Sequence, residues 1–126
     1  MREECLAFRV RRLNRRVTRL YDAALRPFGL TTAQFNMLVA LGLGLDLKAS
    51  DLVRALDLEK STVSRNLKRL VEHRWVRPVD EARVLRLTAA GQRLVTRTLP
   101  AWRQAQREAA VAIDADLVDA IRRVPR

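Results

Sequence analysis

The chain has 126 residues, enough for one domain of ordinary size. Hydrophobic residues make up 48% of the chain, which has only four glycines and four prolines, and this composition argues against a disordered or fibrous protein. The 25 basic and 14 acidic residues give a net charge of +11, which favours a polyanionic partner, either nucleic acid or an anionic membrane surface. The longest apolar stretch, residues 37–45, is far shorter than the roughly 20 residues that span a bilayer. A single cysteine suits a reducing compartment, and we expect a cytoplasmic protein.

The first predicted helix covers residues 5–26 and ends at Pro27 and Gly29. Its apolar residues recur at alternating steps of four and three, the spacing of a helix that packs along one narrow stripe. They are Leu6, Val10, Leu13, Val17, Leu20 and Ala24. The second helix begins with a capping box, in which Thr31 caps and Gln34 reaches back, and it stops near Gly42.

A very short strand over residues 45–47, a short helix over 49–56 and a tight turn at 57–59 are predicted next. A further helix covers residues 60–73. The periodicity then changes, and residues 75–79 and 83–87 are expected to form two strands around a turn at 80–82. Thr88 caps a last long helix in which Pro100 is expected to cause a kink, and a short acidic segment over residues 114–123 closes the chain. This order predicts a mainly α fold with a small β-wing, a winged helix-turn-helix.

The helix over residues 60–73 carries the functional prediction. At 100° per residue, Val63, Leu67 and Leu70 fall in one narrow arc and form its buried face. The opposite face holds cations and hydroxyls, and arginine matches the acceptor edge of guanine while hydroxyls match bases or phosphates. We therefore predict that this face enters the major groove of double-stranded DNA. The predicted major-groove residues are Ser61, Thr62, Ser64, Arg65, Lys68 and Arg69, whereas Arg77, Arg83 and Arg86 are expected to contact the DNA backbone or the minor groove.

The run from Leu52 to Arg65 resembles the helix-turn-helix of the MarR family of bacterial transcription regulators, and residues 17–21, 29–35 and 87–91 resemble other segments of that family. The resemblance implies a winged-helix homodimer that binds a pseudo-palindromic operator. It also implies repression that is relieved by a small, often aromatic, ligand or by oxidation. The expected single domain, residues 1–126, would comprise a DNA-binding lobe over 31–88 and dimerisation helices over 1–30 and 89–126. Dimerisation is assigned to Leu6, Val10, Leu13 and Val17, packing with Leu99 and Trp102.

Three features depart from the family pattern. The Asp-x-Arg that is usual near the wing tip is not intact, because Arg83 comes one residue late after Asp80, and this puts minor-groove reading by Arg83 in question. Arg74 stands where a glycine usually ends the recognition helix, so that either a non-glycine residue adopts an unusual backbone conformation or the helix end differs. The C-terminal helix is short, which favours a weaker dimer.

Cys5 is a candidate redox residue, because one branch of the family senses hydroperoxides through a cysteine of the first helix and has a partner tyrosine at the position of Tyr21. Counted back from Thr31, however, Ala7 occupies the register of that cysteine, and two residues rotate a helix by about 200°. We therefore favour a bystander thiol. His73 is the only histidine, and no catalytic triad, paired carboxylates or phosphate loop is found. We expect no metal, no cofactor and no enzymatic activity.

Several alternatives stay open at this point. Arginines four residues apart on the first helix, such as Arg11 and Arg15, repel one another and favour an anionic partner. Candidate anions are the aspartates of the terminal segment, within the chain or across a dimer, and DNA phosphates; simple solvation is the third option. Trp75 and Trp102 are expected to anchor the core or an interface, with a ligand pocket as the alternative for one of them. Two other functions are a module that binds an acidic protein, and a protein whose first helix lies on anionic lipid.

Overall fold

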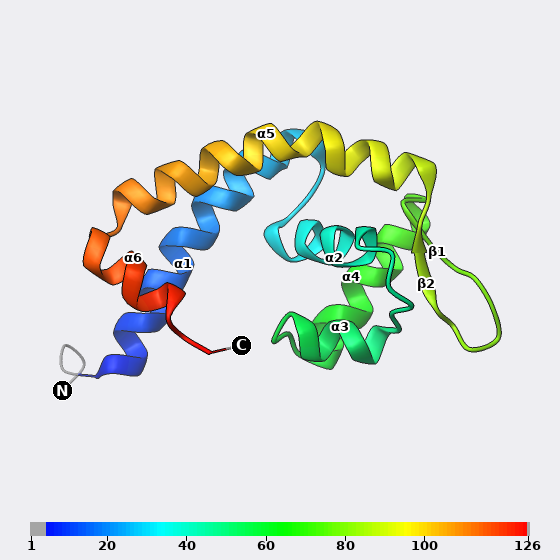
Figure 1. Cartoon of the computed structure of the whole chain (residues 1–126), viewed down its shortest axis with the longest axis horizontal. Helices are drawn as coiled ribbons and strands as arrows, with labels where there is room; N and C mark the ends of the chain where they lie inside the picture. The colour runs from blue at the N-terminus through cyan, green and yellow to red at the C-terminus, as the bar shows by residue number, and fades with distance from the viewer. Residues whose placement is uncertain (1–4, 126) are drawn as a thin grey trace.

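The computed structural model describes residues 5–125. Figure 1 shows an arch: a long helix runs over the top, two helices descend at one end, and the remaining helices lie with a β-hairpin below the other end. The predicted mainly helical winged helix-turn-helix is confirmed. The elements are α1 (Leu6–Leu25), a 3-10 turn η1 (Arg26–Phe28), α2 (Thr32–Gly42), α3 (Ala49–Ala55), α4 (Lys60–Glu72), β1 (Val76–Pro78), β2 (Leu85–Leu87), α5 (Ala89–Ala112) and α6 (Ala115–Arg122).

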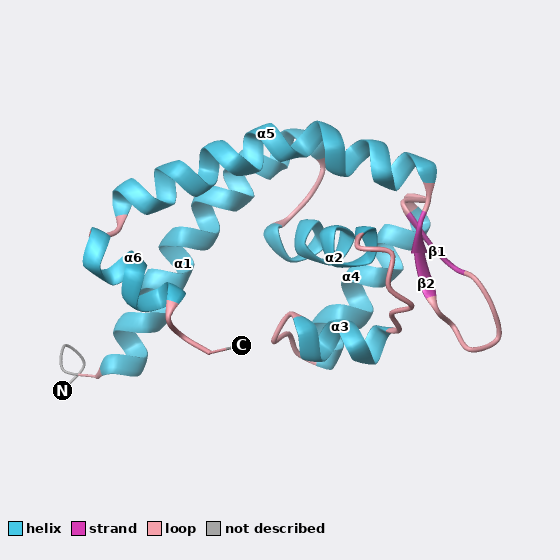
Figure 2. Ribbon diagram, in the orientation of Figure 1, coloured by secondary structure: helices cyan, strands magenta, loops and turns pink. Residues whose placement is uncertain are grey.

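Helices α1, α5 and α6 form what we call the arm, and residues 31–88 form the lobe (Figure 2). Helix α1 packs mainly on α5, and α5 also contacts α2 and β2 of the lobe. Pro100 lies inside α5, which continues to Ala112 as predicted. The bend takes the form of a gradual bow along the helix rather than a sharp break (Figure 1). No helix of the described part is both long and apolar enough to cross a membrane.

Two helix starts follow directly from the sequence. The hydroxyl of Thr31 accepts a hydrogen bond from the main-chain N–H of Gln34, and the Gln34 side chain accepts one from the N–H of Thr31, so the predicted capping box is confirmed. Thr88 caps α5 in a similar way, since its hydroxyl accepts from the N–H of Gly91 at 3.0 Å. Both caps lie where the lobe joins the arm.

The wing is shorter than predicted. β1 and β2 are antiparallel, with Val76 opposite Leu87 and Pro78 opposite Leu85. The strand predicted over residues 45–47 is reduced to a single bridge between Leu47 and Leu85. The reason is local: the N–H of Leu47 bonds to the carbonyl of Leu45 at 3.0 Å, and this tight turn cannot continue as an extended strand.

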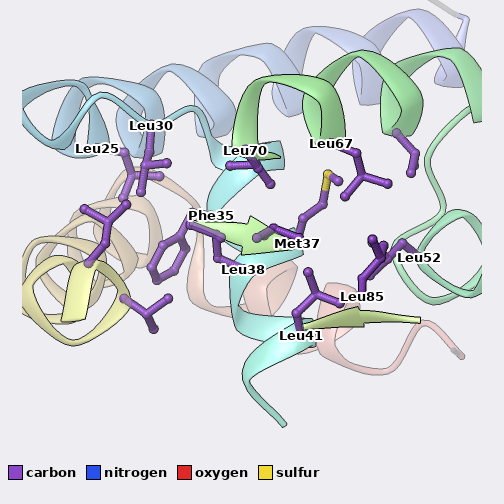
Figure 3. Packing of buried hydrophobic residues seen from close by; sticks show 14 residues of the cluster. Leu25, Leu30, Phe35, Met37, Leu38, Leu41, Leu52, Leu67, Leu70 and Leu85 are labelled. Carbon is purple, nitrogen blue, oxygen red and sulfur yellow. The ribbon is translucent and has the colours of Figure 1, made fainter. Parts of the chain in front are cut away.

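The hydrophobic core lies in the lobe and extends to α5 (Figure 3). Side chains of α2 stand at its centre, among them Phe35 and Leu38, and leucines of α3, α4 and β2 surround them. Leu94 and Val95 of α5 close the core from the arm side. Burial of this apolar surface therefore fixes the lobe to the arm as well as the lobe helices to one another.

Candidate nucleic-acid interface

Helix α4 presents one buried face and one exposed face, as its sequence predicts. Val63, Leu67 and Leu70 are buried in the core. Of the six side chains predicted to enter the major groove, Ser61, Ser64, Arg65, Lys68 and Arg69 are exposed and Thr62 is half-buried. Within residues 5–125, no cation of α4 forms an ion pair, so the positive charges of α4 are not neutralised by a carboxylate of the chain.

The turn before α4 is tight because Asp57 adopts a left-handed conformation, with φ of 49°. The N–H of Leu58 reaches back to the carbonyl of Val53, which closes the predicted turn between α3 and α4. At the start of α3, the N–H of Lys48 donates to the carboxylate of Asp51 at 2.8 Å. This hydrogen bond, assisted by the neighbouring guanidinium of Arg54, lowers the pKa of Asp51. The start of α3 and the turn that joins α3 to α4 are thus each closed by a hydrogen bond from a main-chain N–H.

The end of α4 resolves the question raised by Arg74. This residue has φ of 60°, so it adopts the left-handed conformation that a glycine usually supplies. The N–H of Trp75 bonds to the carbonyl of Leu70 and the N–H of Arg74 to that of Val71, the hydrogen-bond pattern of a Schellman motif. The hydroxyl of Thr88 donates to the carbonyl of Arg74 at 2.6 Å and holds this conformation in place.

The structure places the three wing arginines differently. Arg77 is exposed and stands opposite Arg86 in the ladder. Arg86 is half-buried and forms an ion pair with Asp46, which precedes α3. Arg83 lies in the turn of the wing with φ of 59°, and its N–H bonds to the carbonyl of Asp80. Of the three wing arginines, only Arg77 and Arg83 are therefore exposed and form no ion pair with a described residue.

The residues assigned to dimerisation divide into two groups. Leu6 and Val10 of α1 are 74% and 56% exposed, whereas Leu13 and Val17 are half-buried. Leu99 and Trp102 pack against the core of their own chain. The six residues predicted for dimerisation therefore have different roles. Leu6 and Val10 form an exposed apolar stripe on α1, whereas Leu99 and Trp102 hold α5 on the lobe.

Trp102 is the main anchor between α5 and the elements beneath it. Its ring lies 6.1 Å from that of Phe35 in α2 and 6.3 Å from that of Tyr21 in α1. The hydroxyl of Tyr21 donates to Gln106 of α5, and burial raises the pKa of this phenol. Trp102 is thus a core residue, as one of its two predicted roles states.

Cys5 is exposed and directly precedes α1. Tyr21 follows sixteen residues later in the same helix, so that about 24 Å of helix axis separates the two residues within one protomer. The described residues contain no group of His, Cys, Asp and Glu that could hold a metal ion.

A cavity of about 380 Å³ opens between the arm and the lobe, where the end of α1, the start of α2 and the end of α4 meet. Arg26 and Arg69 contribute cations to its wall, and Trp75 contributes a ring that stacks on His73 with 4.4 Å between centroids. The carboxylate of Asp22 also lines the cavity and accepts two hydrogen bonds from Thr32, at 2.8 and 2.6 Å. Trp75, with its alternative role at a ligand pocket, is the only residue that pointed to this cavity in advance, because the wall comes from three separate elements.

One contact on the inner flank of α4 was not predicted. The amide of Asn66 is half-buried and bonds to the side chain of Gln34, which is only 5% exposed. Two features of the sequence were available: Asn66 is a polar residue beside the buried arc of α4, and Gln34 is a capping-box residue near the core. Neither signal alone identifies the partner.

The fold and this basic, exposed helix define a winged helix-turn-helix protein of the DNA-binding class. The sequence model of the MarR family matches residues 28–87. The M. tuberculosis transcriptional regulator MosR, known from a crystal structure, is 32% identical to this chain. The match covers 96% of this chain and 98% of the MosR chain, with a TM-score of 0.80. We conclude that the chain belongs to the MarR family.

Two further solved structures are similar. MosR from M. tuberculosis in complex with DNA is 33% identical, with a TM-score of 0.79 and coverage of 93% of this chain and 94% of that chain. The repressor CouR bound to p-coumaroyl-CoA has a TM-score of 0.85 over 95% of this chain and 88% of its own, but at 20% identity this likeness concerns the fold. None of the curated protein sequences matches the chain.

Proposed function

We propose that this protein is a homodimeric transcription regulator that binds double-stranded DNA at a pseudo-palindromic operator and represses transcription there. The observation that carries the proposal is the polarity of α4, whose apolar side is fixed in the core while its exposed side presents Arg65, Lys68 and hydroxyls. A B-form major groove is about 12 Å wide, which accommodates one helix with its side chains. The DNA complex of MosR, a relative with 33% identity, supports this use of the fold.

Within this proposal each predicted side chain has a role. Residues 31–88 read DNA: Ser61, Thr62, Ser64, Arg65, Lys68 and Arg69 face the major groove, and Arg77, Arg83 and Arg86 contact the backbone or the minor groove. Such contacts involve no catalytic step, and the function places the protein in the cytoplasm with the chromosome.

Residues 1–30 and 89–126 join two protomers in this proposal. The stripe of Leu6 and Val10 is exposed, as are Leu117 and Ile121 of α6, and a second copy would remove this apolar surface from water. Within the described residues no ion pair links the arginines at positions 11, 12, 15, 16 and 19 to the aspartates of α6. A partner protomer is therefore our preferred source of the compensating anions. A dimer would set two α4 helices about 34–36 Å apart, one turn of DNA.

We place the effector that relieves repression in the cavity of about 380 Å³ between arm and lobe, a size within the usual range for small-molecule sites. The support is Arg69, which lines this cavity and also belongs to the exposed side of α4. A small ligand with an acidic group would engage Arg26 and Arg69 and stack near Trp75. The occupied cavity would then draw Arg69 away from DNA.

The deciding experiment is a fluorescence anisotropy titration of the full chain against the DNA upstream of its own coding region. A shuffled duplex of the same length and base composition serves as the control. We expect tighter binding to the upstream DNA, by at least about 1,000-fold. Equal affinity for both duplexes at all salt concentrations would contradict the proposal.

A further inference from the structure

A closed set of hydrogen bonds joins the recognition helix α4 to the start of α2. The amide nitrogen of Gln34 donates to the amide oxygen of Asn66 at 3.2 Å, and the amide nitrogen of Asn66 donates to the carbonyl of Thr62 at 3.0 Å. The amide oxygen of Gln34 accepts from the N–H of Thr31 at 3.1 Å. Each oxygen and nitrogen of the two amides thus has a partner; the Gln34 side chain is buried and the Asn66 side chain is half-buried.

The apolar contacts along the length of α4 do not fix its rotation as sharply. Val63, Leu67 and Leu70 hold the helix through apolar burial, which is not directional. A hydrogen bond, in contrast, weakens steeply when its angle or length changes. A side chain about 5 Å from the helix axis moves by about 1.3 Å when the helix rolls by roughly 15°, enough to lose a two-point hydrogen bond to a base edge.

The start of α2 is itself tied to the arm. Asp22, near the end of α1, accepts hydrogen bonds from both the N–H and the hydroxyl of Thr32. The main-chain N–H of Thr31, the preceding residue, holds the Gln34 side chain, and Gln34 holds Asn66. The orientation of α4 is therefore set relative to α1 through polar contacts that run from Asp22 to Asn66.

We propose that Gln34 and Asn66 are positioning residues for sequence recognition: their hydrogen bond fixes the rotation of α4 about its axis and so places Arg65 and its neighbours on the bases. The inference rests on the proposed function, because it concerns how that helix reads DNA. Neither residue needs to touch DNA for this role. Loss of the link lowers discrimination between sequences, while the attraction of the basic surface to phosphates is retained.

The test uses the full chain and compares Gln34→Met, Asn66→Leu, the double variant Q34M/N66L and the control Thr31→Ala. Met and Leu keep the approximate shapes of Gln and Asn but make no amide hydrogen bonds. Thr31→Ala removes a helix cap at the same place and leaves the Gln34 side chain intact. An operator selected from random duplexes with the wild-type chain, and the same duplex with one base pair changed in each half-site, give a discrimination ratio from two dissociation constants.

Each single variant should lower Tm, because it leaves the buried amide of Gln34 or the half-buried amide of Asn66 without its partner. The double variant should recover part of the loss, because both amides are gone. The discrimination ratio should nevertheless fall by about fivefold or more in the double variant, as expected when one base contact is misplaced. The salt dependence should stay unchanged, since phosphate contacts are kept. Thr31→Ala should lower Tm and leave the ratio unchanged.

A double variant with wild-type discrimination overturns the inference, as does a Thr31→Ala variant that loses discrimination to the same extent. A wild-type chain without preference for any duplex would instead refute the proposed function. In that case the inference is decided without DNA, by NMR residual dipolar couplings of the α4 amides. We expect the couplings to report a rotated α4 in Q34M/N66L and an unchanged one in Thr31→Ala; unchanged couplings in the double variant overturn the inference.

Discussion

The main-chain carbonyl of Trp75 occupies the space that a β-carbon at Gly91 would need. Leu87 lies within 2.8 Å of the same position. The first turn of α5 therefore lies directly on the segment that links α4 to the wing. Gly91 lies inside a regular helix and needs no unusual backbone conformation. A glycine is required here because there is no room for a side chain.

Replacing Gly91 by Ala should destabilise the protein by about 2 kcal/mol or more, since backbone must move and this cost exceeds the gain of about 1 kcal/mol in helix propensity. Gly42→Ala is the matched control, because the nearest atom there is the movable end of the Leu87 side chain at 3.2 Å. Its effect should stay within about 1 kcal/mol of zero. Urea unfolding followed by circular dichroism measures both, and equal effects would disprove the close approach.

The arginine at the centre of the exposed side of α4 should determine sequence preference. Arg65→Ala should reduce the preference for the operator by about 1–3 kcal/mol if the guanidinium contacts a base in two places. Arg97→Ala, which removes an exposed arginine from α5, should leave the preference unchanged. Anisotropy titrations with specific and shuffled duplexes give both values. If Arg65→Ala binds like the wild type, α4 does not read the groove in this orientation.

The ion pair between Arg86 and Asp46 competes with any phosphate that Arg86 would contact. Asp46→Asn should therefore tighten binding to all duplexes and steepen the dependence of log K on log salt by up to about one unit. Arg86→Ala should have the opposite effect, flattening the slope by about one unit. The double variant should behave like Arg86→Ala. An unchanged slope in Arg86→Ala would mean that this arginine only fixes the wing to the loop before α3.

The only tyrosine of the chain gives a direct pH test. Burial raises the pKa of Tyr21 above the ordinary value of about 10. A group whose folded pKa is raised contributes stability below its unfolded pKa, and that contribution is lost as the pH rises through the folded value. Phenolate absorbance should therefore titrate at higher pH in the folded chain than in urea. Stability should fall above about pH 10 in the wild type and less so in Tyr21→Phe. Coincident titrations would show that the phenol is not buried.

The exposed stripe of α1 should be needed for the dimer and not for the fold. Leu6→Asp combined with Val10→Asp should halve the mass measured by light scattering, because two carboxylates would enter an apolar contact. Leu43→Asp is the control, since Leu43 is 69% exposed on the lobe. Circular dichroism should show unchanged helix content for both. A double variant that keeps the wild-type mass would place the dimer contact elsewhere.

The elements that could be predicted from sequence are those set by local rules. The Thr31–Gln34 box and the Thr88 cap depend on residues three apart, and the buried arc of α4 depends on helical periodicity. The short strand at Leu47 was overestimated, because its alternation of apolar and polar residues says nothing of the turn that shortens it.

The features that could not be predicted join residues far apart in the chain. The Arg86–Asp46 pair spans forty residues, and the Gln34–Asn66 bond thirty-two. Both require the docking of one element on another, which periodicity does not specify. The division of the dimerisation set likewise depends on tertiary packing, because Trp102 packs on Phe35 and Tyr21 of its own chain.

Helix α5 begins directly after β2 and continues for 24 residues, about 36 Å, to the turn before α6. Its first turn rests on the carbonyl of Trp75. A tilt of roughly 5° at that end would displace the far end by about 3 Å if the helix moves as a rigid rod. Under that condition, a small tilt at the wing end of α5 would produce a displacement of several ångströms at the distal tip of the arm.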